Sequence, residues 1–206
     1  MRSATRDKYA EVDPVAQRFT VHLKPVVELT PNRFFELAGI NRDLRMELTA
    51  GGELIVMPPA GGGTGSRNAE ITLQLGMWAK QNGAGTTFDS STGFTLPNGA
   101  VRSPDASWVE RSRWEALTDE QRRKFVPLCP DFVIELRSPT DSLSILQDKM
   151  QEYLDNGAKL GWLIDPEQKR VHVYRPQTEF QELENQIEIS GDPVLSGFVL
   201  DLREIW

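Results

Sequence analysis

Apolar positions along the chain repeat with the period of an α-helix in three stretches. A helix is predicted to begin with Thr30 as its N-cap and Pro31 as its first residue, and another covers residues 66–81. The clearest pattern lies in residues 141–157, where Gly157 would end the helix. Its apolar stripe consists of Leu143, Leu146, Met150, Tyr153 and Leu154.

Other stretches alternate or are continuously apolar, as strands are. Residues 44–57 predict a hairpin that turns at Gly51-Gly52, with Leu44, Met46 and Leu48 alternating with Arg45 and Glu47. Further strands are predicted in residues 85–109, with Asn98-Gly99 as a second hairpin turn, at 132–136 and in a hairpin over 160–176. The glycine-rich residues 58–65 predict a flexible loop. This order of elements indicates an α/β (α+β) protein with a mixed β-sheet flanked by helices. We expect an N-terminal arm over residues 1–30 and a single domain over 31–206.

The stretch "CPDFVIELRSP", residues 129–139, places charged residues in an apolar strand. Glu135 follows three apolar residues, and Arg137 lies two positions later on the same side of the strand. Because burying a carboxylate costs several kcal/mol unless it is paired, Glu135 needs a partner. Either a salt bridge with Arg137 or a bound cation would provide one.

A second acid has a similar setting, since Asp105 stands before small and apolar residues in "SPDASWV". Asp105 fits a turn at the start of a strand, but two carboxylates on neighbouring strands are also able to share one hard cation. Mg²⁺ usually takes one or two protein carboxylates together with a substrate phosphate. A pair of acids with a nearby base therefore indicates phosphodiester hydrolysis.

Composition narrows the class of protein. One cysteine and two histidines argue against an intrachain disulfide or a usual zinc site, so any metal is expected to be held by oxygen. With no apolar run long enough for a signal peptide or membrane span, we expect a cytoplasmic protein.

The net charge of -7 argues against a wholly basic nucleic-acid-binding protein, but it is compatible with a local basic patch. One candidate patch, which equally fits a solvated helix face, consists of Arg111, Arg113, Arg122, Arg123 and Lys124, near Trp108 and Trp114.

From about Pro31 to Pro176 the chain resembles the Uma-two (Uma2) endonuclease family, first catalogued as a cyanobacterial-type domain of unknown function. The resemblance rests on "RMELTAGGELIVMPPAGG", "SPDASWV", "PDFVIELRSPTDS", "KMQEYLDNGAKLGWLIDP" and "VHVYRP". It implies a restriction endonuclease-like fold of the PD-(D/E)xK superfamily and a DNA nuclease that depends on Mg²⁺ or Mn²⁺.

The resemblance also implies roles for individual residues. Asp105 and Glu135 stand in the two acid positions, with Glu47 as a further metal ligand. Arg137 occupies the usual lysine position, while Lys149 on the following helix matches the lysine of related members. Arg137 is able to stabilise charge but not to act as a base, whereas Lys149 is able to orient water or the phosphate.

Two departures, Arg137 in the lysine position and Asn68 where many relatives carry histidine, support an alternative function. In that case the chain is a catalytically inactive nucleic-acid-binding or assembly module that retains the nuclease fold. DNA is the expected partner in both cases. A homodimer is also expected, with its contact formed by the N-terminal arm or by the apolar tail "GFVLDLREIW".

Overall fold

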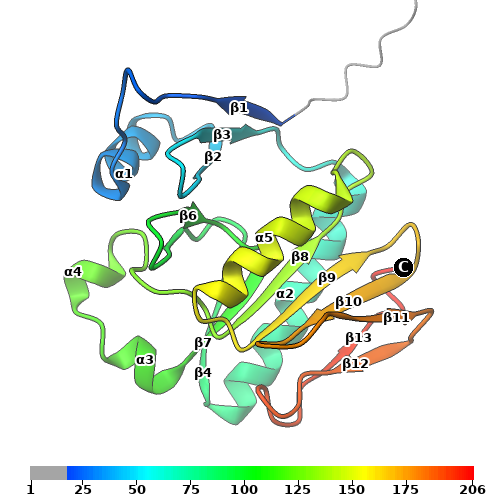
Figure 1. The fold of residues 1–206 in the computed structure, drawn as a ribbon. Coiled ribbons are helices and arrows are strands. Elements are labelled where there is room, and N and C mark those ends of the chain that lie inside the picture. The colour runs from blue at the N-terminus through cyan, green and yellow to red at the C-terminus, as the bar shows by residue number, and fades with distance from the viewer. Residues whose placement is uncertain (1–17) are drawn as a thin grey trace, which may run out of the picture.

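The computed structural model describes residues 18–206 and folds them into three β-sheets and five helices (Figure 1). None of the helices in this part of the chain is long and apolar enough to cross a membrane. The helices are α1 (Pro31–Ile40), α2 (Gly62–Asn82), α3 (Arg111–Glu115), α4 (Asp119–Arg122) and α5 (Leu143–Asp155).

A six-stranded sheet, in the order β11-β10-β9-β8-β7-β4, forms the centre of the molecule. Its neighbouring strands are antiparallel except for β8 and β9, which are parallel and are connected through α5. The strands are β4 (Gly85–Asp89), β7 (Ala106–Glu110), β8 (Phe132–Leu136), β9 (Leu160–Asp165), β10 (Arg170–Tyr174) and β11 (Gln181–Glu184).

The remaining strands form two smaller sheets. One has the order β1-β3-β2-β6-β5, and the other pairs β12 (Glu188–Ser190) with β13 (Val199–Asp201). Phe19–Val21 of the predicted arm is β1 and pairs with β3, whereas residues 1–17 of that arm lie outside the described residues. The division into an arm and a domain therefore stays a prediction. The five-stranded sheet consists of β1 (Phe19–Val21), β2 (Arg45–Leu48), β3 (Leu54–Met57), β5 (Phe94–Thr95) and β6 (Val101–Arg102).

The faces of the central sheet carry different helices, with α5 on one face and α2 on the other (Figure 1). Along β8, Phe132 and Ile134 pack with residues of α2, whereas Val133 packs with residues of α5. Since side chains alternate along a strand, Glu135 points to the same face as Val133, toward α5.

Several local predictions are confirmed. Thr30 accepts a hydrogen bond from the backbone N–H of Arg33 and caps α1, and Gly83, with a φ of +61°, ends α2 in the left-handed region. One predicted boundary is wrong. α2 begins at Gly62 rather than at residue 66, because extending a helix that has already formed costs less than starting one, even through glycines. In the C-terminal tail, Phe198, Leu200, Leu202 and Ile205 are buried in the core, whereas Val199 is 48% exposed.

Phe132 lies at the centre of the core, with no exposed surface and an edge-to-face contact to Trp162 at 4.8 Å between ring centroids. Replacing Phe132 with alanine is expected to lower the free energy of unfolding by about 3–5 kcal/mol, because it leaves a cavity. Urea denaturation measures the change. Ile187→Ala, at a side chain that is 63% exposed, is the control and should change stability by less than about 0.5 kcal/mol. Equal effects of the two substitutions would contradict the prediction.

Candidate active site

Glu135 lies on β8, and Asp105 immediately precedes the neighbouring strand β7. Ala106, the first residue of β7, is paired with Ile134, so Asp105 lies beside the end of β8 that carries Glu135. The backbone N–H of Leu136 donates to Asp105 Oδ2 at 2.9 Å, which ties the carboxylate to the second strand. The structure therefore brings together the two acids that the sequence singled out.

Lys149 reaches this pair of strands from α5. Its Nζ lies 2.8 Å from an oxygen of Glu135 and 2.8 Å from an oxygen of Glu47, and the side chain is only 8% exposed. One turn later, the hydroxyl of Tyr153 donates to Glu135 at 2.9 Å. The helical position of Lys149, at the edge of the apolar stripe, is what allows its long side chain to contact the sheet.

Glu47 is buried, with 1% of its surface exposed, while Leu44 is 48% exposed. The predicted alternation of the hairpin, with its apolar residues on the buried side, is thus wrong at these positions. The burial of Glu47 is compensated on both oxygens. Lys149 and the backbone N–H of Ser103 contact Oε1, and Arg102 contacts Oε2 at 3.1 Å.

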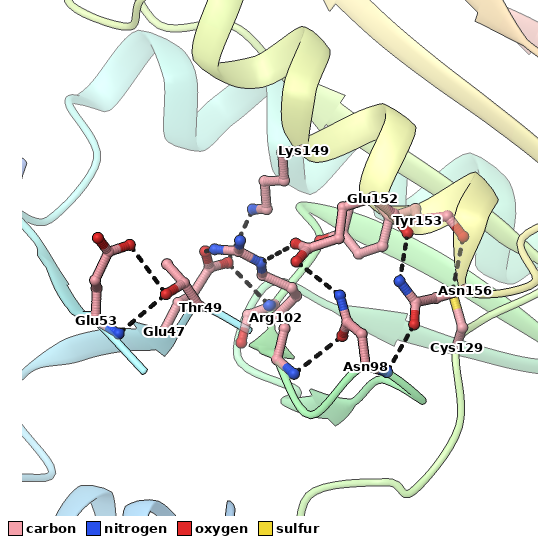
Figure 2. Close-up of polar contacts among 12 residues, drawn as sticks. Glu47, Thr49, Glu53, Asn98, Arg102, Cys129, Lys149, Glu152, Tyr153 and Asn156 are labelled. Carbon is pink, nitrogen blue, oxygen red and sulfur yellow. Dashed lines mark hydrogen bonds and ion pairs between the residues drawn. The ribbon is translucent and has the colours of Figure 1, made fainter. Parts of the chain in front are cut away.

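Arg102 extends the charged cluster on the other side of Glu47. Figure 2 shows its guanidinium between Glu47 and Glu152, whose Oε2 lies 2.6 Å from Arg102 Nε. Sequence reasoning missed Arg102. The available signal was an arginine next to Val101 in a short strand just before Pro104-Asp105, because such a charge is costly to bury without acidic partners.

The carboxyl groups differ in how well their charges are compensated. Burial would raise the pKa of Glu47, but Lys149 and Arg102 outweigh it and lower the pKa to about 2. For Glu135, burial raises the pKa to about 7 despite Lys149, and Asp105 adds to the increase. Burial also raises the pKa of Asp105. Glu47 is therefore well neutralised, whereas Lys149 compensates the charge of the Asp105–Glu135 pair only in part.

Asn68 on α2 completes the surroundings of Asp105. Its Nδ2 donates to Asp105 Oδ1 at 3.1 Å, while its own Oδ1 is buried and has no hydrogen-bond partner within residues 18–206. Asn68 thus orients Asp105 through its amide group, in the position where the family resemblance led us to expect a histidine.

Arg137 lies apart from this cluster. Its guanidinium pairs with Asp165 at the end of β9 and donates to the backbone carbonyl of Asp141. Its partners in the part of the chain that the structure describes do not include Glu135, so the predicted alternative of a Glu135–Arg137 salt bridge is not formed. A role for Arg137 in stabilising charge at the site stays a prediction.

The predicted basic patch is largely engaged in local contacts. Arg113 pairs with buried Asp131 at 2.9 Å, and Lys124 pairs with Glu120 at 2.9 Å. Arg122 lies over the ring of Trp114. These contacts favour the interpretation of this region as a solvated surface that is fixed to the sheet.

The donor set fits a hard cation at Asp105 and Glu135 better than at Glu47. Among residues 18–206 there is no group of three or more His, Cys, Asp or Glu side chains arranged to hold a metal ion. Two carboxylates suffice for Mg²⁺, which completes its octahedron with waters and substrate oxygens. Both oxygens of Glu47 already accept hydrogen bonds, from Lys149 and Ser103 on one oxygen and from Arg102 on the other. A metal would have to compete with these donors, and the role of Glu47 as a third metal ligand stays a prediction.

The chain matches a protein family and resembles a solved structure. Residues 31–203 match the Uma2 family model, described as "Putative restriction endonuclease". The chain is also similar to a crystal structure from Anabaena variabilis ATCC 29413, described as "a putative nuclease belonging to DUF820". The TM-score is 0.71 at 23% identity, and the similarity covers 85% of this chain and 96% of the other. No curated protein matches the chain. These findings show the restriction endonuclease-like fold predicted from the sequence.

Proposed function

Because the chain belongs to the Uma2 family, we propose that it is a divalent-metal-dependent endodeoxyribonuclease of the PD-(D/E)xK type, which hydrolyses phosphodiester bonds in DNA. The observation that supports this most is the juxtaposition of Asp105 and Glu135 with Lys149 in direct contact with Glu135. Two acids whose charge is only partly compensated by one buried lysine form a site that suits both a cation and a phosphate.

In this proposal Asp105 and Glu135 hold Mg²⁺ or Mn²⁺. When bound, the metal supplies Lewis-acid chemistry and lowers the pKa of a bound water. Lys149 binds the scissile phosphate or orients the water with its ammonium group, and Tyr153 holds Glu135 in place through its hydroxyl. Asn68 and the N–H of Leu136 fix Asp105. Arg137, which pairs with Asp165 apart from this cluster, is limited to stabilising the charge of the substrate, because a guanidinium does not act as a base at neutral pH.

Cleavage of supercoiled plasmid DNA tests the proposal. The wild-type protein is expected to nick or linearise the plasmid with Mg²⁺ or Mn²⁺ and to stop when EDTA removes the metal. Asp105→Asn should be inactive, because it removes one of the two charged ligands. A preparation of Asp105→Asn that cuts as fast as the wild type would rule out this site. Calorimetry that finds no Mg²⁺ binding, together with intact DNA affinity, would instead support a catalytically inactive nucleic-acid-binding module.

The role of Glu47 is open to a separate test. Its contacts favour a residue that orients Lys149, while the family resemblance favours a metal ligand. If Glu47 orients Lys149, Glu47→Gln is expected to lower the cleavage rate by about 10–100-fold and leave the Mg²⁺ affinity within about threefold of wild type. Isothermal titration with Mg²⁺ in the absence of DNA measures that affinity. Asp105→Asn is the control that should lose it. A loss of affinity in Glu47→Gln as large as in Asp105→Asn would make Glu47 a ligand.

We further propose that the protein works as a cytoplasmic homodimer, because cutting both strands of DNA favours two sites and symmetric dimers are common. In this proposal the contact comes from the N-terminal region, where Phe19 is 65% exposed and Val21 43% exposed, rather than from the tail, most of whose apolar residues are buried. Light scattering after size-exclusion chromatography measures the mass of the particle, and a monomer at every concentration would contradict the dimer.

A further inference from the structure

A groove of about 670 Å³ lies between α2 and the edge strand of the central sheet, β4. It is lined on the helix side from Gly65 to Lys80 and on the strand side by Thr87 and Asp89. Since a helix rises 1.5 Å per residue, the lining residues of α2 extend over about 22 Å. The groove is thus long and open rather than a closed pocket for a small molecule.

One end of the groove is continuous with the candidate active site. Asn68 lines the groove and donates its amide hydrogen to Asp105. Arg45, on β2, also lines the groove, and its positive charge lowers the pKa of Asp105 against the effect of burial. A chain that occupies the groove would therefore arrive at the Asp105–Glu135 pair.

The groove has cations at its two ends, and its floor combines small residues with apolar ones. Arg45 lies at the end near Asp105, and Lys80 lies in the last turn of α2. Between them the helix presents Gly65, Ala69 and Gly76 together with Leu73 and Met77, which are each 55% exposed. Asp89 is the one acidic residue in this lining, and it accepts hydrogen bonds from Ser91.

We propose that this groove binds the sugar-phosphate backbone of one DNA strand and leads it to Asp105 and Glu135. This inference rests on the proposed nuclease function. Arg45 contacts a phosphate beside the carboxylates, and Lys80 contacts a phosphate further along the strand. One strand of a duplex advances about 3.4 Å per nucleotide, so the length of α2 along the groove corresponds to about six nucleotides. In a chain with a net charge of -7, such local cations are needed to hold a polyanion.

The dependence of DNA affinity on salt tests the groove. Fluorescence anisotropy of a short labelled duplex is measured over a range of salt concentrations, with Ca²⁺ in place of Mg²⁺. Each phosphate contact contributes about -0.9 to the slope of log K against log salt. Arg45→Gln and Lys80→Gln are each expected to reduce the slope by about 0.9, and the double variant by about 1.8. Lys124→Gln on α4, with the same change in charge, is the matched control and should keep the wild-type slope.

A second variant tests the groove through its shape. Ala69→Trp fills the groove from an exposed helical position and is expected to weaken DNA binding by about tenfold, since it blocks contacts along the strand. Gln81→Trp, at an exposed position of α2 outside the groove lining, should bind as the wild type. Thermal melting of every variant shows whether the fold is kept.

The possible outcomes separate this inference from the proposed function. If the wild type cuts DNA while the groove variants bind with unchanged affinity and slope, the groove assignment is wrong and the function stands. If Lys124→Gln loses the slope instead, the DNA lies against the region of α3 and α4, and the groove assignment is again wrong. If the wild type neither binds nor cuts DNA, the proposed function fails together with the groove.

Discussion

Replacing Glu135 with glutamine is expected to lower the rate of DNA cleavage by about 1,000-fold while the fold remains intact. The loss corresponds to about 4 kcal/mol in the activation barrier, which is within what a misplaced metal ion costs. The fold should survive, because the amide oxygen of the new side chain still accepts from Tyr153 and Lys149. The substitution therefore separates the charge of Glu135 from its packing.

The measurement is the rate of plasmid relaxation with Mg²⁺, made alongside thermal melting of the same preparations. Glu115→Gln is the matched control, since Glu115 lies exposed on α3 and should cut at the wild-type rate. A Glu135→Gln variant that melts like the wild type and retains more than about a tenth of its rate would remove Glu135 from the proposed chemistry.

Replacing Lys149 with methionine is expected to lower the free energy of unfolding by about 3 kcal/mol. Removing one partner of a buried ion pair costs about 3–5 kcal/mol, because the other charge is left uncompensated. We expect the lower end of this range for two reasons. Arg102 and Ser103 continue to neutralise Glu47, and Glu135 is able to take up a proton because its pKa is already raised to about 7.

The same variant reports on the metal site through stability rather than activity. A ligand that binds only the folded state stabilises it by about 2.7 kcal/mol at a concentration 100 times its Kd. Without the ammonium of Lys149 near Glu135, added Ca²⁺ should bind the acids more tightly. The melting temperature of Lys149→Met should therefore rise more with Ca²⁺ than that of the wild type.

Lys124→Met is the control for both measurements. Lys124 is 47% exposed and pairs with Glu120 on the surface, so its loss should cost less than about 1 kcal/mol and should leave the response to Ca²⁺ unchanged. Lys149→Met with the stability of this control would show that the acids do not depend on Lys149. An unchanged response to Ca²⁺ in Lys149→Met would argue against a cation at Asp105 and Glu135.

Much of the fold was predictable because its signals are local. The apolar stripe of α5 gives its helical period, Ser142 stands at the N-cap position without a capping hydrogen bond from its side chain, and Gly157 follows the end of the helix in the left-handed region. The apolar run before Glu135 is strand β8, and Asn98-Gly99 forms a turn with Gly99 at a positive φ. In each case the residues that carry the signal also adopt the structure, so no knowledge of distant contacts is needed.

The candidate site was predictable in part. The unusual placement of acids in apolar sequence pointed to Asp105 and Glu135, and the helical position of Lys149 indicated that its side chain reaches the sheet. Arg102, which pairs with Glu47, was missed. Arg137 was considered as a salt-bridge partner of Glu135, but in the structure it pairs with Asp165. Sequence spacing gives the side of a strand on which a residue lies, but it does not identify the charged residue that the side chain contacts on that side.

The sequence by itself determined the helical and extended segments, the two acids that are costly to bury and the lysine at the edge of a helical stripe. Only the tertiary structure decided how their charges are shared. The pairing of β7 with β8 brings Asp105 beside the end of β8, where it accepts from the N–H of Leu136, while the packing of α5 against the sheet brings Lys149 between Glu47 and Glu135. The physical reason is that each charge is compensated by residues far away in the chain, and those distances are fixed only when the strands pair and the helix packs on them.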